Sequence, residues 1–520
     1  MTSEKIDALC EPSTMLADEA GHHRAELGAL QRMLGAPRSD LEALLEPALA
    51  KQVSVNQVSD LLGQSWAKLK ELRQLCKDDW GVAWKDPQIA TALAKANHFL
   101  QPGDTFSLDK AGNALAQACS RAVESGEAPL NLAHIRTGEA LLATLLQEYP
   151  RAAAFYAQAA ALPGLHPSLQ WHYQSRRALT LADLGREFMD NAALEECIHI
   201  YQEKVLTLAP RTQRPQDWAT TQNDLGNALG VLGQRRRGTR MLEESIIAFE
   251  NALSEQGREK ASLEWAATQN NLGNTLGILG QRQNNTEMLE KSLQAFECAL
   301  EVRTRENSPH EWATTQNNLG SVLQALGQRK NDAQLLKRSV EAYKQVLLEW
   351  ARDQAPLHWA ATLNNLGTAL RMLGEHRKSP RTLEKSVAAY RNALAERTRE
   401  RVPQDWAMTQ NNLGAALQKL GEREENTQIL EHAIAAYENA LKQWTREQIP
   451  MAWAMTMANL AVAQKTLAQR LNDVGLARVA LTGFEAVAQV FRSASHAQYY
   501  EFATEQVAKT RKILEGLGGD

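Results

Sequence analysis

The stretch WAMTQNNLGAALQKLGER at residues 406–423 decides the fold, because almost the same letters occur twice more upstream. They read WAATQNNLGNTLGILGQR at 265–282 and WATTQNNLGSVLQALGQR at 312–329. Tryptophans follow the same step of 47 residues, at Trp218, Trp265, Trp312, Trp359, Trp406 and Trp453, and Trp171 lies one further step upstream. A fixed period of this length is typical of a repeat protein.

Each repeat contains two blocks with helical spacing. With the tryptophan as position 0, an apolar residue or leucine follows at +7, +11 and +14, which places all four on one face of a helix. A second block, such as LEKSVAAYRNAL from Leu383, has apolar residues at i, i+4, i+7 and i+11. A proline such as Pro403 predicts the start of the first helix. A Leu279-Gly280 pair predicts its end, with glycine in the left-handed conformation. The repeat is a helix–turn–helix unit, and the fold class is all-α.

Small residues recur where the two helices of a repeat must approach. Glycine stands at +8, as Gly320 and Gly367, and serine stands at the matching place in the second block, as Ser339 and Ser386. Glycine inside a helix costs about 1 kcal/mol, so its repetition predicts close packing that a side chain would block.

The pattern N-L-G-x-A-L…L-G…S/A-x-x-A/S-Y/F-x-x-A-L resembles the tetratricopeptide repeat, whose usual length is about 34 residues. The extra length lies partly between the helices, for example RRRGTRM at 235–241, and partly after the second helix. The asparagine-rich, long-period form looks closest to the kinesin-light-chain type found in many bacterial proteins. The resemblance covers roughly residues 126–490. It implies a right-handed α-solenoid, or superhelix, whose first helices line a concave groove.

Three regions are expected. Residues 1–125 do not follow the period and form an N-terminal helical domain, with stretches such as DLEALLEPALAKQ and a loop at 99–109. Residues 126–492 form the repeat array, with one short repeat at 130–162 and about seven long ones. Residues 493–520 form a capping helix that closes the array through Tyr499, Phe502, Val507 and Leu514.

A polar pair interrupts each first helix at +5 and +6. The resemblance implies that +2, +6, +9 and +13 face the groove, and that an asparagine at +6 hydrogen-bonds the backbone of an extended peptide. A carboxamide can donate and accept, so it suits a peptide of any sequence. The expected groove residues are Asp224, Asn271, Asn318, Asn365, Asn412 and Asn459, with Asn227 and Asn274 at +9 and Thr314 at +2. The alternative is that these amides bond only to neighbouring helices. The +5 asparagines are expected to link adjacent repeats.

Charge is nearly absent from these groove positions, which disfavours recognition of acidic C-terminal tails. Arginine also repeats after the first helix, at Arg235, Arg282, Arg329 and Arg423, and Arg377 is displaced by one place. These side chains form a possible basic ridge for an acidic partner. Solvated charge, or charge that complements helix C-termini, is the alternative.

Composition narrows the function class. The net charge of −4 lacks the basic footprint of a nucleic-acid binder. The odd number of cysteines, five, and the lack of a CxxC pair indicate reduced thiols. Histidines show no metal-ligand spacing, and no phosphate-binding or nucleophile motif occurs, so we expect no catalytic residues, no metal and no cofactor. No signal peptide or membrane span is evident, which favours the cytoplasm.

The sequence therefore favours a non-enzymatic scaffold or adaptor that binds an extended peptide or a partner protein in the groove. Two alternatives stay open. The chain could be a self-assembling structural protein, with residues 1–125 pairing copies into a homo-oligomer, or a small-molecule sensor that uses those residues.

Overall fold

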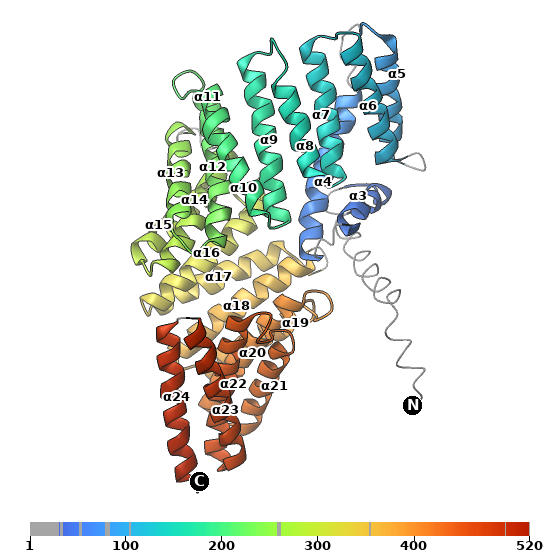
Figure 1. Ribbon diagram of the computed structural model, residues 1–520. Coiled ribbons are helices and arrows are strands. Elements are labelled where there is room, and N and C mark those ends of the chain that lie inside the picture. Colours follow the sequence, from blue (N-terminus) through green and yellow to red (C-terminus); the bar gives the residue numbers. More distant parts are fainter. Residues whose placement is uncertain are drawn as a thin grey trace, which may run out of the picture. The chain divides into compact units, whose positions relative to one another are not determined.

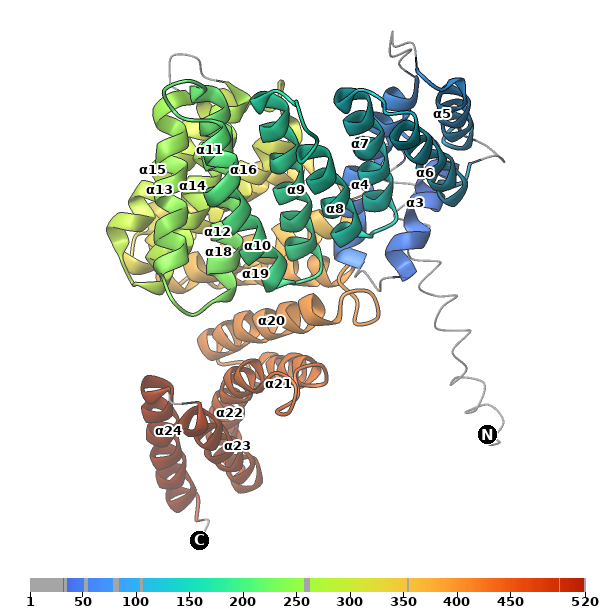
Figure 2. The same ribbon diagram turned by 45° about the horizontal axis from the view of Figure 1, so that its top comes forward.

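The structure, a computed structural model, describes residue 31 and residues 35–50, 55–77, 84–102, 106–256, 262–352, 355–494 and 496–518. The chain divides into two compact units, Met1–Thr304 and Arg305–Asp520. Within each unit, successive helices lie side by side (Figure 1; Figure 2). None of the residues in these ranges is in a strand, and the all-α repeat fold is confirmed.

Among the described residues of the first unit, four helices precede the repeats: α3 (Arg38–Ala50), α4 (Val55–Lys77), α5 (Pro87–Phe99) and α6 (Leu108–Glu124). The repeats follow as α7 (Pro129–Leu145) with α8 (Tyr149–Ala160), α9 (Pro167–Glu187) with α10 (Asn191–Ile200), α12 (Pro215–Arg235) with α13 (Arg240–Gln256), and α14 (Leu263–Arg282) with α15 (Thr286–Val302). A π-helical turn, η1 (Tyr201–Val205), and α11 (Leu206–Leu208) extend α10.

The second unit contains four more helix pairs and a final helix. These are α16 (Pro309–Arg329) with α17 (Ala333–Glu349), α18 (Pro356–His376) with α19 (Pro380–Leu394), α20 (Pro403–Glu424) with α21 (Thr427–Leu441), and α22 (Pro450–Leu471) with α23 (Val474–Ser493), followed by α24 (Ala497–Gly516).

Close approach of the paired helices is confirmed at the +8 glycines. A Cβ on Gly320 would lie 2.8 Å from the Tyr343 ring, and one on Gly367 would lie 2.8 Å from the Tyr390 ring. The serine of the second helix donates a hydrogen bond to the carbonyl of that glycine, at 2.7 Å for Ser339 with Gly320. The four repeats from α12–α13 to α18–α19 therefore each have a buried aromatic ring seated on a glycine, with a hydrogen bond from a serine beside it.

The predicted end of the first helix is wrong. Gly280 lies inside α14, where a Cβ would come within 3.1 Å of Leu289, so this glycine permits a second close approach and does not end the helix. The left-handed residue comes four places later, at Asn284, and recurs at the same place in the next repeats as Asn331, Lys378, Glu425 and Asn472. Much of the length assigned to the turn is helix.

The placement of Trp171 on the 47-residue period is also wrong by one residue. The contact of Gly233 with Leu242 is repeated by Gly185 with Leu194, 48 residues upstream. Helix α9 begins at Pro167 and α12 at Pro215, which gives the same step of 48. The residue of α9 that matches the +6 position is therefore Arg176.

In four repeats, an arginine seven places before the tryptophan ties the linker to its repeat, namely Arg211, Arg352, Arg399 and Arg446. The guanidinium carbon of Arg352 lies 5.4 Å from the Trp359 ring centroid, and Arg352 Nε pairs with Glu396 at 2.6 Å. Arg211 does the same with Trp218 and Glu255. The tryptophan thus serves both the apolar stripe and a cation–π contact.

The N-terminal helices share one apolar core with the first repeat, which includes Leu69 of α4, Leu115 of α6 and Leu142 of α7. Of the helical stretch that the sequence predicts at residues 8–34, only residue 31 lies within the described residues. The predicted boundaries at 125/126 and 492/493 stay predictions.

At the C-terminus, α24 packs on α23, but half of the predicted face is wrong. Tyr499 and Phe502 are 41% and 39% exposed, whereas Ala503, Gln506, Thr510 and Leu514 are buried. The glycine at +8 is Ala461 in this last repeat, and the second helix compensates with Gly483, where a Cβ would lie 3.2 Å from that of Ala461.

Among the described helices, α23 is long and apolar enough by composition to span a membrane. Within this helix, Phe484 and Val487 are buried. The predicted cytoplasmic location and absence of membrane insertion stay predictions.

Candidate functional site: the polar stripe of the first helices

The predicted groove residues lie half-buried on the first helices. Asp224 and Asn227 are on α12, Asn271 is on α14, and Asn318, Asn365, Asn412 and Asn459 are on α16, α18, α20 and α22. Asn274 is exposed. Thr314 is half-buried, and its hydroxyl donates to the carbonyl of His310 at 3.0 Å, one turn back in its own helix.

In the second unit, the +6 amides bond to the +5 amides of the preceding repeat. Asn365 Nδ2 donates to Asn317 Oδ1 at 3.3 Å, and Asn412 Nδ2 donates to Asn364 Oδ1 at 3.1 Å. Asn459 Nδ2 makes the same bond to Asn411 at 3.4 Å. The +5 asparagines therefore link adjacent repeats, as expected. The +6 amides bond to neighbouring helices and are also partly accessible to a ligand.

The +5 and +6 amides also touch within a repeat. Asn364 Nδ2 donates to Asn365 Oδ1 at 3.4 Å, so Asn412, Asn364, Asn365 and Asn317 form one chain of hydrogen bonds across three repeats. In the first unit, Asn270 donates to Asn271 at 3.3 Å, and Asn223 donates to Asp224 at 3.3 Å. Such a chain fixes the rotamer of every amide in it.

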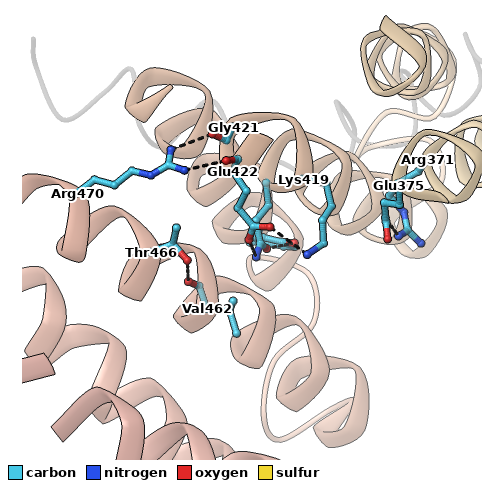
Figure 3. Close-up of polar contacts among 10 residues, drawn as sticks. Arg371, Glu375, Lys419, Gly421, Glu422, Val462, Thr466 and Arg470 are labelled. Carbon is cyan, nitrogen blue, oxygen red and sulfur yellow. Dashed lines mark hydrogen bonds and ion pairs between the residues drawn. The ribbon is translucent and has the colours of Figure 1, made fainter. Parts of the chain in front are cut away.

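Two residues of the predicted basic ridge, Arg235 and Arg282, donate hydrogen bonds to backbone carbonyls of the preceding repeat. Arg235 donates to Gly185 O at 2.8 Å, and Arg282 donates to Gly233 O at 2.7 Å. Arg470 donates to the carbonyls of Gly421 and Glu422, both at 2.9 Å (Figure 3). Each guanidinium thus binds the C-terminal end of a neighbouring first helix, where positive charge is favourable.

In the repeat where Arg377 is displaced, a histidine contacts a backbone carbonyl of the preceding repeat. His376 stands seventeen residues after Trp359, as Arg329 and Arg423 stand after their tryptophans, and His376 Nε2 lies 2.9 Å from Asn331 O. A ridge that binds an acidic partner stays a prediction.

Charged side chains near the ends of the first helices escaped the sequence reasoning. Arg371 pairs with Glu375, and Lys419 Nζ lies 3.0 Å from Glu422 Oε2; Figure 3 shows both pairs on successive first helices. Each pair lies three or four residues apart, a spacing that the sequence could have revealed. Because opposite charges are paired, this part of the stripe adds no net charge.

Helix α4 covers the corresponding face of α9. Glu71 of α4 pairs with Arg176 at 2.5 Å, and Lys68 pairs with Asp183 at 3.1 Å. Leu75 lies 3.3 Å from the place of a Cβ on Gly138 of α7. Within the first unit, side chains of α4 therefore occupy the stripe at α9.

In the part of the chain that the structure describes, no three histidine, cysteine, aspartate or glutamate side chains lie together so that they could hold a metal ion. Burial raises the pKa of the Cys119 thiol to about 12 and raises that of Cys197 further, so these thiols stay protonated. Burial also raises the pKa of Asp224 to about 6, an effect that the hydrogen bond from Asn223 and the charge of Arg186 oppose.

Comparison with known proteins agrees with the repeat pattern. Residues 265–305, 312–349 and 406–443 match the family model described as tetratricopeptide repeat. No curated protein has a sequence that matches the chain significantly.

Solved structures show distant likeness. BtubC (BKLC) from P. vanneervenii is 18% identical over 51% of this chain and 92% of its own, with a TM-score of 0.34. A putative kinesin light chain from Podospora anserina with nearly identical repeats is 18% identical over 45% of this chain and 99% of its own, at 0.31. A Rap protein complexed with competence and sporulation factor is 12% identical over 74% and 99%, at 0.34. At these values the three structures carry no information about a ligand of this chain.

Proposed function

The chain carries tetratricopeptide repeats, a family of non-enzymatic protein-interaction folds, and from this premise we propose that it is a scaffold that binds an extended peptide segment along the polar stripe of its first helices. The observation that carries the proposal is the chain of half-buried amides in the second unit, which neighbouring repeats hold in one orientation.

These amides retain bonding capacity. A carboxamide has two N–H groups and two acceptor sites. Asn365 uses one N–H toward Asn317 and one acceptor site toward Asn364. One donor and one acceptor therefore remain, which matches the N–H and C=O of a peptide backbone. Because the amide is already held by its neighbours, little rotamer entropy is lost when a peptide binds.

The side chains beside the amides define the kind of segment. Thr314, Ala361, Met408 and Met455 stand at +2, and none is charged. Met455 is 47% exposed, and methionine adapts its shape to different apolar partners. We therefore propose a segment whose side chains are mostly uncharged along the second unit, with specificity from apolar contacts and affinity from the backbone.

The test compares three forms of the full chain against an immobilised random heptapeptide library, with affinities of enriched peptides measured by calorimetry. The first form is unchanged and the second carries Asn318→Ala, Asn365→Ala and Asn412→Ala. The third is a matched control with Lys337→Ala, Glu384→Ala and Glu431→Ala, which are exposed residues of the second helices 47 residues apart. We expect the control to bind as the unchanged chain does and the asparagine variant to lose at least about tenfold, or about 1.4 kcal/mol.

The asparagine variant also loses bonds between repeats, so its thermal unfolding is measured in parallel. A second variant avoids this effect: Met408→Lys with Met455→Lys places charge in the stripe without touching the amide chain. Equal peptide affinity in all folded variants contradicts the proposal.

A further inference from the structure

A small cavity opens on the stripe in the first unit, between α9, η1 and α12. Its volume is about 40 Å³, and its walls include Leu179, Tyr201, Asp224 and Val231. About 15 Å³ is enough for one water molecule, so the cavity has room for a small polar group. Leu179 is 39% exposed and stands at the +9 place of α9, which puts the cavity on the face assigned to peptide binding.

The Tyr201 hydroxyl is buried and has no hydrogen-bond partner. The tyrosines at the matching place in other repeats do have partners. Tyr390 pairs with Thr368 at 2.9 Å and Tyr437 with Gln418 at 3.0 Å, while Tyr343 bonds to Ser321. Ser321 and Thr368 stand 22 residues before their tyrosines, where the Tyr201 repeat has Leu179. The hydroxyl lacks a partner because leucine replaces the residue that would supply one.

The carboxylate on this cavity is equally specific to it. All five repeats from α14 to α22 have asparagine at +6, whereas α12 has an acid there, Asp224. The carboxylate accepts one hydrogen bond, from Asn223. The nearby cation Arg186 lines the cavity but is ion-paired with Asp183, which also holds Lys68. A carboxylate in a half-buried site favours a cationic partner over a neutral one.

The position of the cavity adds a third argument. Lys68 and Glu71 of α4 cover the stripe on α9, immediately before the cavity. A peptide lying along the stripe from α14 toward α12 meets α4 at this place. The cavity therefore lies where one end of a bound segment would be located.

We propose that this cavity binds a primary ammonium group, carried by the N-terminus or by a lysine side chain of a segment that lies along α12 and α14 of the first unit. The ammonium donates to the Asp224 carboxylate and to the Tyr201 oxygen, and the carbon atoms next to it pack between Leu179 and Val231. The inference rests on the proposed peptide-binding function, and a probe that is not a peptide separates the two.

The probe is n-butylammonium, which copies the lysine side chain, and its neutral counterpart is n-butanol. Both are titrated into the full chain labelled at leucine and valine methyl groups, with the signals of Leu179 and Val231 as reporters. We expect butylammonium to shift both signals in a saturable way and butanol to bind at least tenfold more weakly. Equal shifts from the two probes show an apolar cavity only. No shift with butylammonium shows that Arg186 or ordered water satisfies Asp224. Either result overturns the proposal.

Two variants keep the test independent of folding. Asp224→Asn installs the residue that the next five repeats have, and Tyr201→Phe installs the residue found as Phe249 and Phe296 in the next two. We expect Asp224→Asn to abolish the butylammonium shift and Tyr201→Phe to weaken it severalfold, with methyl signals outside the cavity unchanged. Full retention of binding by Asp224→Asn overturns the proposal.

The source of the ammonium is found with those library peptides that shift the Leu179 and Val231 methyl signals of the unchanged chain. Each peptide is made with a free N-terminus and acetylated lysine, and again with an acetylated N-terminus and free lysine. Loss of binding on one acetylation, in the unchanged chain but not in Asp224→Asn, identifies the source. Peptides that bind regardless of both acetylations, while butylammonium shifts the methyl signals, leave groove binding intact and overturn the assignment of this cavity to the segment.

Discussion

The glycines at +8 give the sharpest prediction about the fold. In Gly367→Ala, the new Cβ would lie 2.8 Å from the Tyr390 ring, and that ring is fully buried. Helix propensity alone would stabilise the variant by about 1 kcal/mol. Overpacking a buried ring costs about 1 to 3 kcal/mol, so we expect a net loss of about 1 kcal/mol in the free energy of unfolding.

The last repeat suggests how the loss is relieved. There, alanine at +8 is Ala461, and the second helix has Gly483. The matching residue beside Tyr390 is Ala389, which is buried. We expect Ala389→Gly to destabilise the chain alone and to offset part of the loss when combined with Gly367→Ala. The coupling between the two changes should be at least about 0.5 kcal/mol in a double-mutant cycle.

The assay is urea unfolding followed by far-ultraviolet circular dichroism, with hydrogen exchange in α18 and α19 as the local measure, because a repeat array can open in parts. The control is Gly63→Ala in α4, where nothing lies within 4 Å of the new Cβ. We expect that variant to be as stable as the unchanged chain or more so. A Gly367→Ala variant that is more stable than the unchanged chain would refute the close approach of these helices.

Three further predictions concern the charge of Asp224, the hydrogen bonds of Arg470 to the preceding repeat, and the buried thiols. Burial raises the folded-state pKa of Asp224 to about 6, against 3.8 as its ordinary value. The protonated form is therefore favoured by folding, and the stability advantage of Asp224→Asn over the unchanged chain should shrink as pH falls from 7.5 through 6 to 4. Arg186, Cys197 and Tyr201 face this carboxylate. Over that range Arg186 stays cationic, and Cys197 and Tyr201 stay neutral because burial raises their pKa values. Parallel curves of stability against pH for the two chains would contradict the raised pKa of Asp224. Arg470→Ala removes two charged hydrogen bonds and should destabilise the α20–α22 interface by about 1.5 to 3 kcal/mol, seen as faster hydrogen exchange in α22, with exposed Arg492→Ala as the control. Cys119 and Cys197 should react with a disulfide reagent only after unfolding, and prompt labelling of Cys119 in the native chain would show that its burial is wrong.

Much of the fold could be predicted from the sequence because one helix–turn–helix unit recurs several times along the chain. The tryptophan step, the proline before it and the +8 glycine each correspond to a contact that the structure repeats, such as Gly320 with Tyr343. The sequence-based prediction is wrong where a residue is required by a packing contact and was read as a requirement of backbone conformation. Gly280 ends no helix, because its purpose is to admit Leu289. The one-residue shift at Trp171 was visible in the step from Pro167 to Pro215.

The polar stripe could be located from the sequence, but its hydrogen bonds could not. The wheel placed +6 on one stripe with +2, +9 and +13 and placed +5 away from it, whereas the structure joins Asn412 to Asn364 and Asn365 to Asn317. A helical wheel describes one helix and contains no information about the offset between neighbouring repeats. The cover of α4 over α9 is a contact between residues more than 100 apart, such as Lys68 with Asp183, and no local pattern announces it.

The most direct measurement is a crystal structure of the chain with a peptide enriched from the random library. The account predicts an extended peptide along α16, α18, α20 and α22, with its backbone N–H and C=O groups within hydrogen-bond distance of the Asn365 and Asn412 amides. A peptide bound on the second helices or on residues 1–125, with these two amides bonded only to Asn317 and Asn364, would contradict it.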